Sequence, residues 1–553
     1  SGAANMDTRA LLLLLPRSRP LLAPRPATTT TASVRAACCL VPPKVFTSWP
    51  RQRSRPLSPP VIMAVAPQTT ESPKEAEVEL DWLSSSPPVS ARTNKAAEEV
   101  LEFDWLDQWY PFAPVCDLDP AAPHGKTVLG LRVVAWHDRN AGEWRVFDDA
   151  CPHRLAPLSE GRIDAKGRLQ CVYHGWCFDG RGSCEFIPQA PALGPPVHKS
   201  SKACASAYPT VVQNSILWFY PRAGAEHRDV LQRKRPPFVP EMDDPSFTTA
   251  IGMRDFPFGY DVLMENLMDP AHVPYAHKGL VQGLSYKEDP GRYESDTERG
   301  GPLKIKIEDA NLDGFVWPQE NGGSFWYAAP CMVHYSSLVP RDEKKAGGRR
   351  FMLVFMCVPV APGRSRLIWA FPRNFGHLLD KIIPRWFFHI AQNKLLDSDL
   401  YLLHAEERNF AAAGSENWHK AVYVPTSADA IVLAFRNWFR KHCNSQVGWA
   451  APTVKQLPAS PTRDTLMERY WSHVAQCASC SAALKDIKAL EVALQLASVA
   501  VLGFLAATLQ RTTSPVHRAG LVSLAVLCMA ASRWLDTFVR NTFYFQDYVH
   551  AHK

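Results

Sequence analysis

The stretch CPHRLAPLSEGRIDAKGRLQCVYHGWCF, residues 151–178, decides how its part of the chain folds, because it holds two cysteine–histidine pairs. Cys151 and His153 form the first pair, and Cys171 and His174 form the second, in the pattern C-x-H…C-x2-H. Zinc is one interpretation, since two cysteines and two histidines often bind it tetrahedrally. Zinc fingers, however, usually pair like with like. Because each half here offers one thiolate and one imidazole, we favour a two-iron, two-sulfide cluster with both histidines on one iron.

Short segments typical of β-strands surround this stretch. They are TVLGLRVVAW, EWRVFDD and SILWFYP, rich in β-branched and aromatic residues and separated by Gly, Asn and Asp. We therefore predict a small antiparallel β domain over residues 103–225. Cys177 and Cys184 lie close to the two pairs, and we interpret them as ordinary core or loop thiols.

A second group of metal-binding residue types lies in ENLMDPAHVPYAHKG. Steps of three residues would place Asn266, Asp269 and His272 on one side of a helix. His277 follows five residues later and would point elsewhere on an unbroken helix, so we expect Pro274 to bend or end the helix and let the imidazoles converge. Two histidines and one carboxylate are the ligand set of mononuclear non-haem Fe(II), which leaves positions open for dioxygen and substrate.

The carboxylate ligand is expected from a long helical segment that contains LLDSDLYLLHAEER. This segment offers four candidates, namely Asp397, Asp399, Glu406 and Glu407. Upstream of it, KIKIEDA and RRFMLVFMCVPVAPGRSRLIWAFPRNF have the composition of strands. A sheet with a long covering helix makes residues 226–455 an α+β domain, and the proline-rich stretch APTVKQLPASPTRD marks a linker after it.

Two apolar stretches near the C-terminus, residues 492–509 and 519–538, are each close to the length of a membrane crossing. A soluble helical hairpin is the alternative, because Glu491 and Arg533 lie at or inside their edges. We favour a membrane anchor, since both stretches are nearly free of charge and such end charges can reach the interface.

A C-x-x-C pair, Cys477 and Cys480, stands just before the first apolar stretch, with His473 nearby. Such a pair is a redox couple, half of a zinc site or two incidental thiols. The chain has no second C-x-x-C, which argues against zinc. We predict a disulfide switch that thioredoxin addresses.

The N-terminal part differs in composition from the rest. Residues 1–64 are rich in Arg, Ser, Thr and Pro and poor in acids, which is typical of an organelle transit peptide rather than a secretory signal. Residues 65–102 have the composition of a flexible arm. Residues 1–70 sum to +8, from nine Lys/Arg and one acid, so the rest of the chain sums to about −1 and carries no basic footprint for nucleic acid.

From residue 103 to its end, the chain resembles the Rieske non-haem iron oxygenases, and among them the plant group of pheophorbide a oxygenase. The stretches that carry the resemblance are FDWLDQWYP, GRLQCVYHGWCF, ENLMDPAHVPYAH, FPRNFG and YWSHVAQCASC. The order of motifs agrees as well. The resemblance implies an α+β protein with a Rieske antiparallel β domain at 103–225, a helix-grip-like catalytic sheet domain at 226–455, a linker with the C-x-x-C at 456–488, and two transmembrane helices within 489–553.

The resemblance also implies the roles of individual residues. The [2Fe–2S] cluster would be held by Cys151, His153, Cys171 and His174, and the Fe(II) ion by His272, His277 and Asp399. Asp397 is the next candidate for the third iron ligand. Asp269 would connect an iron histidine to a Rieske histidine of a neighbouring subunit, with Asn266 beside it, in a homotrimer.

The implied reaction is a monooxygenation that uses O2 and electrons from ferredoxin. Its substrate would be a chlorophyll-type tetrapyrrole, with the C7 methyl of protochlorophyllide a oxidised to the formyl of protochlorophyllide b. Ring opening of pheophorbide a and a redox-sensing subunit of the chloroplast import translocon are the alternatives. The protein would lie in the chloroplast inner envelope, or else in the thylakoid, with its catalytic body in the stroma. FWYAAP and FPRNF are candidates to line the pocket.

Overall fold

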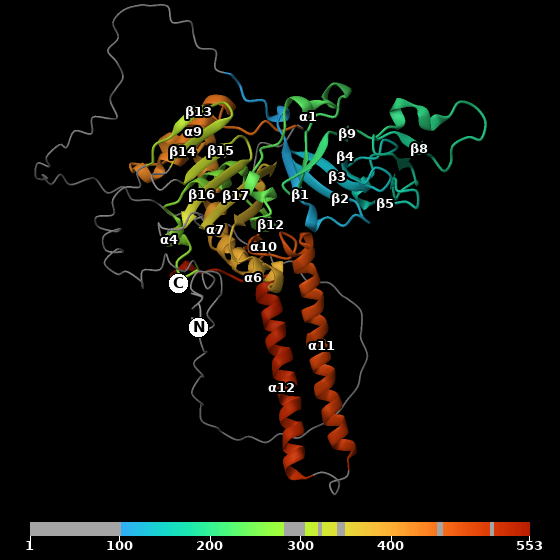
Figure 1. Ribbon diagram of the computed structural model, residues 1–553, viewed down its shortest axis with the longest axis vertical. Helices are drawn as coiled ribbons and strands as arrows, with labels where there is room; N and C mark the ends of the chain where they lie inside the picture. Colours follow the sequence, from blue (N-terminus) through green and yellow to red (C-terminus); the bar gives the residue numbers. More distant parts are fainter. Residues whose placement is uncertain are drawn as a thin grey trace, which may run out of the picture. The chain divides into compact units, whose positions relative to one another are not determined.

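The computed structural model describes residues 101–280, 305–318, 323–339, 349–450, 457–508 and 514–552. The expected transit peptide, residues 1–64, and the arm up to residue 100 lie outside the described residues. The α+β class expected from the sequence is confirmed by an antiparallel β part, a larger sheet covered by helices, and two long apolar helices at the end (Figure 1).

The first part of the described chain consists of three small antiparallel sheets. One has the order β2-β3-β4-β9 and contains His124–Val128, Leu131–Asp138, Glu143–Asp148 and Ala207–Tyr208. A second has the order β1-β11-β10 and contains Tyr110–Pro114, Ile216–Phe219 and Thr210–Gln213. The third has the order β5-β6-β7-β8 and contains Arg162–Ile163, Leu169–Gln170, Cys177–Phe178 and Cys184–Phe186. The loops next to this third sheet carry the two cysteine–histidine pairs.

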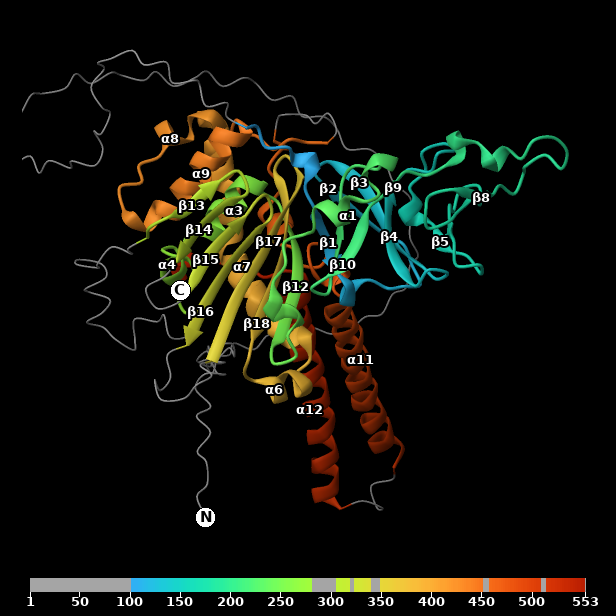
Figure 2. The same cartoon turned by 45° about the horizontal axis from the view of Figure 1, so that its top comes forward.

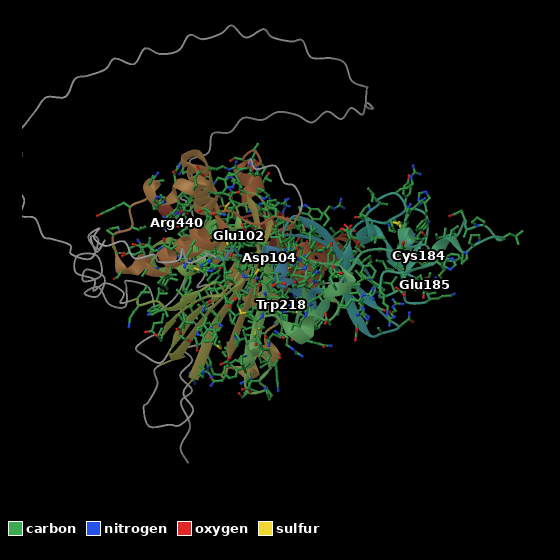
Figure 3. The ribbon with its side chains drawn as sticks, turned by 90° about the horizontal axis from the view of Figure 1, so that it is seen from above. Glu102, Asp104, Cys184, Glu185, Trp218 and Arg440 are labelled. Atoms are coloured by element: carbon green, nitrogen blue, oxygen red, sulfur yellow. The ribbon has the colours of Figure 1, made fainter. Side chains whose placement is uncertain are left out.

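Two separate cores hold these sheets. Cys184 on β8 belongs to a small core, and Trp218 on β11 belongs to the main core. Figure 3 labels both side chains. The main core continues from β1 and β11 into the catalytic sheet, where it includes Met253 and Val354. The small core therefore joins the cluster-bearing sheet to one face of β3 and β4, through Val134, Trp136 and Phe147, while the opposite face of these strands belongs to the main core.

The catalytic part is built on a seven-stranded antiparallel sheet with the order β12-β18-β17-β16-β15-β14-β13. Its strands, in this order, are Thr248–Phe256, Arg364–Arg373, Arg349–Ala361, Met332–Val339, Ser324–Ala328, Gly314–Pro318 and Glu308–Asn311. The long strands β17 and β18 form a hairpin whose turn is Pro362-Gly363, with φ of 70° at the glycine. Proline and a left-handed glycine are the residues that such a turn favours.

Helices cover one face of this sheet, as Figure 2 shows for α3, Tyr260–Met268, and α7, Arg385–Ala413. α7 is tied to the sheet by Trp369 on β18, whose indole N–H donates to the Gln392 side chain at 2.9 Å. Before the apolar pair, the described residues also form the α-helices α1 (Val230–Arg233), α2 (Pro240–Asp243), α4 (Val273–Ala276), α6 (His377–Ile382), α8 (Trp418–Ala421), α9 (Ala430–Cys443) and α10 (Arg463–Leu466). The long helix expected from its periodicity is thus present and lies on the sheet.

The last two long helices, α11 (Ala478–Ala507) and α12 (Pro515–Val539), run side by side (Figure 1). Both are long and apolar enough to cross a membrane, and only 11% and 22% of their most apolar windows are buried. Small residues lie between them, and Ser498 donates to the Ala525 carbonyl at 2.8 Å. Small residues and hydroxyl hydrogen bonds are typical of contacts between helices in lipid. The helix of a soluble core would instead be mostly buried.

The chain that follows α12 returns to the catalytic part. Arg469, which precedes α11, donates to the carbonyls of Asn541 and Thr542 and forms an ion pair with Asp397 of α7. Arg254 of β12 pairs with the same carboxylate at 2.7 Å. All three charged side chains are buried. One carboxylate therefore joins the sheet, α7 and the segment beyond the apolar hairpin.

Replacing Asp397 with asparagine is expected to destabilise the catalytic part by about 3 kcal/mol, because two buried guanidinium groups would lose their charge partner. The measurement is the thermal unfolding midpoint of the detergent-solubilised protein. Asp464→Asn, on the exposed side of α10, is the matched control and should leave the midpoint unchanged. Equal midpoints for the two variants would contradict the proposed role of this carboxylate.

Candidate metal centres

The two loops that carry Cys151/His153 and Cys171/His174 have the same backbone hydrogen-bond pattern. The backbone N–H of Leu155 donates to the carbonyl of Cys151 at 2.8 Å, and the backbone N–H of Gly175 donates to the carbonyl of Cys171 at 3.0 Å. Leu155 and Gly175 both have positive φ, 59° and 72°. At residue 175 a Cβ would lie 3.0 Å from the Pro188 ring, which favours glycine there. Two matching turns therefore face each other and present equivalent ligands.

Within these loops the sulfurs lie inside and the imidazoles lie outside. The cysteines are 1% and 2% exposed, whereas His153 is exposed. The rings of His153 and His174 are 4.5 Å apart between centroids, and Trp176 stacks on His153 at 4.6 Å. A donor set with paired buried thiols and paired outer imidazoles fits a two-iron cluster whose histidine-bound iron faces solvent. Cys177 and Cys184 are buried and free, as interpreted from the sequence.

The second motif differs from its expected geometry, because no single helix carries Asn266, Asp269 and His272. α3 ends at Met268, and Asp269 has an extended backbone, with φ of −98° and ψ of 105°. The physical reason is Pro270, since a residue that precedes proline is disfavoured in the helical region. The expectation that Pro274 would end the helix was wrong as well, because this proline lies in the first turn of α4.

This break brings His272 and His277 together with Asp399, which α7 supplies. The two imidazole centroids are 5.1 Å apart, and Asp399 Oδ2 lies 3.4 Å from His277 Nε2 and 4.0 Å from His272 Nε2. One ligand atom from each of the three residues falls within 4.8 Å of the others. The arrangement has the composition of the two-histidine, one-carboxylate site of mononuclear iron.

Hydrogen bonds orient the His277 ring toward the other two ligands. The Ser398 hydroxyl donates to the Leu395 carbonyl at 2.6 Å, so it accepts from His277 Nδ1 at 2.7 Å. The proton is thereby placed on Nδ1, and the lone pair of Nε2 faces the Asp399 carboxylate. A lone pair and a carboxylate that face each other at 3.4 Å fit a cation between them, as does a second imidazole beside them.

Asn266 and Asp269 contact the same group from the other side. The Asn266 amide lies 3.4 Å from His272 Nε2, and Asp269 Oδ2 lies 3.5 Å from His272 Nδ1. The other Asp269 oxygen accepts from the backbone N–H of Ala271 at 2.7 Å. A carboxylate at the outer nitrogen of a metal-binding histidine sets the tautomer of that ring.

The electrostatics of this site match a cation-binding role. Burial raises the pKa of Asp399 to about 7, although the nearby His272 opposes the shift. Burial, together with His272 and His550, lowers the pKa of His277 to about 3. Burial also opposes a charge on His272, but the hydrogen bond to Asp269 and the charge of Asp399 outweigh it and raise that pKa. The surrounding protein groups compensate the negative charge of the buried Asp399 carboxylate poorly. A divalent cation would compensate that charge.

The other three acidic candidates on α7 do not join the group. Asp397 is occupied by its two arginine partners. Glu407 accepts from the backbone N–H of Gly259 at 2.8 Å. Burial, followed by the charge of Glu265, raises the pKa of Glu406 to about 7, and no iron-site histidine contributes to that shift. Among the described residues, Asp399 is the carboxylate that lies with both histidines.

The C-x-x-C residues also lie in a group that sequence spacing did not predict. Cys477 and Cys480 contact His389, from α7, and His473 also lies within the same 4.8 Å. His473 was noted only as a neighbour in sequence, and His389 was not recognised. His389 and His473 are both histidines, but they lie 84 residues apart in the sequence. Their spacing therefore does not indicate that they belong to one site.

A cavity of about 320 Å³ lies on the other face of the catalytic sheet. Trp326, Ala328 and His334 are among its lining residues, so part of the FWYAAP stretch faces it. Tyr335, the next residue along β16, points the opposite way and donates to Leu267 at the end of α3. None of the iron-site residues lines this cavity.

Comparisons with known proteins identify a Rieske domain and a pheophorbide a oxygenase domain in this chain. The model of the Rieske [2Fe–2S] domain matches residues 108–202, and the pheophorbide a oxygenase model matches residues 327–417. The chain is 45% identical to the protochlorophyllide-dependent translocon component 52 of Arabidopsis thaliana, over 93% of this chain and 99% of that protein. It is 46% identical to flavonoid 8-hydroxylase 2 of Ocimum basilicum, over 81% and 86%. It is 35% identical to pheophorbide a oxygenase of Arabidopsis thaliana, over 90% and 92%. All three are described as chloroplastic.

Proposed function

Because the chain belongs to the pheophorbide a oxygenase group of the Rieske non-haem iron oxygenases, we propose that it is a ferredoxin-dependent monooxygenase of a chlorophyll-type tetrapyrrole. The specific reaction proposed is oxidation of the C7 methyl of protochlorophyllide a to a formyl group. The observation that carries the proposal is the assembly of His272, His277 and Asp399 in a chain that also has a complete set of Rieske ligands.

The protein is an oxygenase with a Rieske cluster and a mononuclear iron. When bound, the cluster supplies single electrons, and the iron activates dioxygen next to a C–H bond. We assign residues 103–225 to the first centre and residues 226–455 to the second. Cys151, His153, Cys171 and His174 would hold the cluster, and His272, His277 and Asp399 would hold the iron.

Several side chains prepare the iron site for this chemistry. Ser398 keeps a proton on His277 Nδ1, so that Nε2 remains a ligand. The Asp269 carboxylate lies 3.5 Å from His272 Nδ1 and favours a proton on that nitrogen, which leaves Nε2 of that ring as the ligand. The Asn266 amide donates to Asp399 and lowers the pKa of that carboxylate against the effect of burial. Each contact holds a ligand in its metal-binding protonation state.

We propose that electrons reach the iron through Asp269 from the Rieske domain of a neighbouring copy in a homotrimer. Among the described residues, no hydrogen bond or ion pair joins the iron-site residues to His153 or His174 of the same chain. The Asp269 side chain is 29% exposed, and His153 is exposed too. Both groups can therefore be reached by another chain.

The methyl-to-formyl conversion consists of two oxygenations. In each one, dioxygen gives one oxygen atom to the substrate and one to water, with two electrons from two reduced ferredoxins and two protons from solvent. The first converts the methyl to a hydroxymethyl, and the second gives a gem-diol that loses water to form the formyl group. The two apolar helices would keep the catalytic part at a chloroplast membrane, for which we propose the inner envelope and the stromal side.

A flavonoid is the second candidate substrate, because the relative described as a flavonoid 8-hydroxylase is as similar to this chain as translocon component 52 is. Pheophorbide a is a further candidate, because a relative that is 35% identical to this chain is described as a pheophorbide a oxygenase. All three are flat conjugated molecules, so the family relationship alone does not choose among them.

Product analysis should distinguish these substrates. Full-length, iron-loaded protein is supplied with reduced ferredoxin, oxygen and one of protochlorophyllide a, pheophorbide a or a flavone, and products are identified by mass spectrometry. We expect the hydroxymethyl and formyl derivatives of protochlorophyllide a. If only pheophorbide a gave a product, with its ring opened, or if only the flavone were hydroxylated, the proposal of protochlorophyllide a as the substrate would be wrong. Omitting ferredoxin is the control and should abolish every product.

A further inference from the structure

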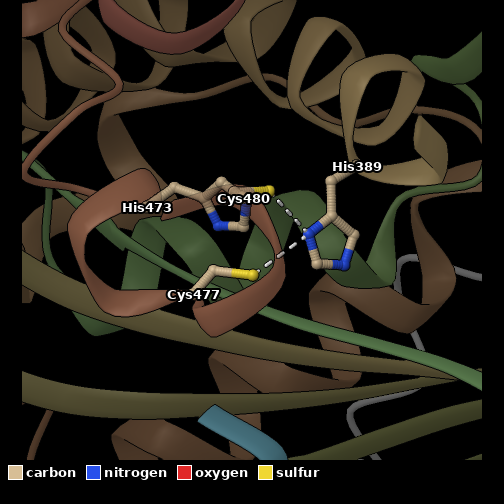
Figure 4. A group of neighbouring side chains, drawn as sticks. All are labelled: His389, His473, Cys477 and Cys480. Atoms are coloured by element: carbon tan, nitrogen blue, oxygen red, sulfur yellow. Dashed lines mark hydrogen bonds between the residues drawn. The ribbon is translucent and has the colours of Figure 1, made fainter. Parts of the chain in front are cut away.

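Four buried side chains meet where the catalytic part joins the first apolar helix. His389 comes from α7, His473 precedes η11 (Val474–Gln476), Cys477 caps the N-terminus of α11, and Cys480 lies in its first turn (Figure 4). They are 1%, 1%, 2% and 3% exposed, respectively. Two thiols and two imidazoles therefore share one closed space.

The ligand-type atoms of these residues have the spacing of a tetrahedral metal site. Cys480 Sγ lies 3.3 Å from His389 Nδ1 and 3.3 Å from His473 Nε2, and Cys477 Sγ lies 3.6 Å from His389 Nδ1. Metal bonds of about 2.3 Å to sulfur and about 2.0 Å to nitrogen, at tetrahedral angles, would place sulfur and nitrogen about 3.5 Å apart. The observed separations agree with that value.

The orientation of both imidazoles provides an independent observation. His389 Nε2 donates to the carbonyl of Ile251 at 3.0 Å, and His473 Nδ1 donates to the carbonyl of Met253 at 2.7 Å. Both acceptors lie on β12, two residues apart, so one edge of the strand sets both tautomers. The remaining nitrogen of each ring then carries a lone pair that faces the two sulfurs. A backbone carbonyl at the outer nitrogen is the usual partner of a metal-binding histidine.

We propose that His389, His473, Cys477 and Cys480 form a structural Zn²⁺ site, separate from both iron centres. Binding would exchange two thiol protons for one ion, giving a neutral group of two thiolates, two imidazoles and Zn²⁺. Tetrahedral S₂N₂ coordination is typical of zinc, and four protein ligands leave no open position for catalysis.

Charges around the group suit this neutral complex. Arg385 lies 3.7 Å from Cys477 Sγ and can donate to a thiolate, while its own charge is balanced by Asp117. Asp117 also accepts from the backbone N–H of Ala478 at 2.9 Å, and so holds the start of α11.

A disulfide between Cys477 and Cys480 explains less of the structure. It has no hydrogen to donate, so both inward lone pairs of the histidines would face sulfur without a donor or a metal. Thioredoxin must also reach a sulfur atom, and both cysteines are buried. The absence of a second C-x-x-C had argued against zinc, but the two histidines provide the missing half of the ligand set.

The site would join the apolar hairpin to the catalytic part. Its ligands come from α7, from the residue before η11 and from the start of α11, and β12 orients two of them. His389 also lies ten residues before Asp399 on the same helix, about 15 Å along its axis. The ion would therefore hold α7 at a set height relative to the membrane segment.

The test uses the full-length protein purified in detergent, with zinc sulfate as the only added metal. Zinc and iron are counted by mass spectrometry, and the zinc absorption edge reports its ligands separately from iron. We expect about one zinc per chain with two sulfur and two nitrogen neighbours. Cys480→Ser and His473→Ala should each lose that zinc while the Rieske spectrum persists. Cys204→Ser, at an exposed thiol, is the matched control and should keep it.

Either of two results would overturn the proposal. One is wild-type protein with less than about a tenth of an equivalent of zinc after incubation and gel filtration. The other is zinc with only oxygen or nitrogen neighbours. If the variants do not fold, thiol modification of the wild type decides the matter, because blocking two cysteines should release one zinc per chain to a colorimetric chelator. Release without thiol modification, or a native Cys477–Cys480 disulfide in the mass spectrum, would also contradict it.

Discussion

Asp399→Ala is expected to lower turnover by more than about 100-fold and to reduce the iron content from about three to about two per chain. The carboxylate lies 3.4 Å from His277 Nε2, and no other acidic side chain among the described residues joins both histidines. Two imidazoles alone would hold the ion weakly. The two remaining irons belong to the Rieske cluster, whose absorption and electron paramagnetic resonance spectra should not change.

Asp397→Ala provides the contrast, because this neighbour on α7 pairs with Arg254 and Arg469. It should lose stability and keep the third iron in whatever fraction remains folded. If Asp399→Ala retained three irons and normal turnover, or if only Asp397→Ala lost the third iron, the assignment of the third ligand would be wrong.

Asp269→Asn is expected to lower turnover by about 100-fold or more while all irons stay bound. The amide keeps the size of the side chain, but it replaces an anionic acceptor 3.5 Å from His272 Nδ1. In stopped-flow experiments the Rieske cluster should be reduced at the normal rate, and its reoxidation by oxygen and substrate should become slow. A purely structural role for Asp269 would change both steps or neither.

Asp464→Asn serves as the control for this carboxylate change, because it removes a charge from the exposed surface. It should reproduce both wild-type rates. Normal reoxidation in Asp269→Asn would exclude this residue from the path between the two centres.

The sequence predicts the parts of these sites that are local. Cys151, His153, Cys171 and His174 lie within one hairpin-like region, and their spacing follows from two matching turns. The pair His272 and His277 is local too. Its geometry was predicted less well, because Pro274 was considered and the stronger helix terminator, Pro270, was overlooked.

Residues that meet only through tertiary packing were harder to predict. Asp397 and Asp399 are two positions apart on α7, so their side chains point about 200° apart around the helix. Which of them reaches the iron-site histidines depends on which face of α7 packs on the sheet. His389 lies 84 residues before His473 and joins the cysteines only because α7 crosses β12 where α11 begins. No periodicity or spacing carries that information.

The return of the chain after α12 has a consequence for biosynthesis. Arg469 is neutralised by Asp397 and donates to the carbonyls of Asn541 and Thr542, which follow the apolar hairpin in the chain. Until the segment after α12 has been made and has folded back, this arginine lacks those partners. The hairpin therefore does more than follow the catalytic part: a variant that ends before α11 would lose buried partners of Arg469 together with the two apolar helices.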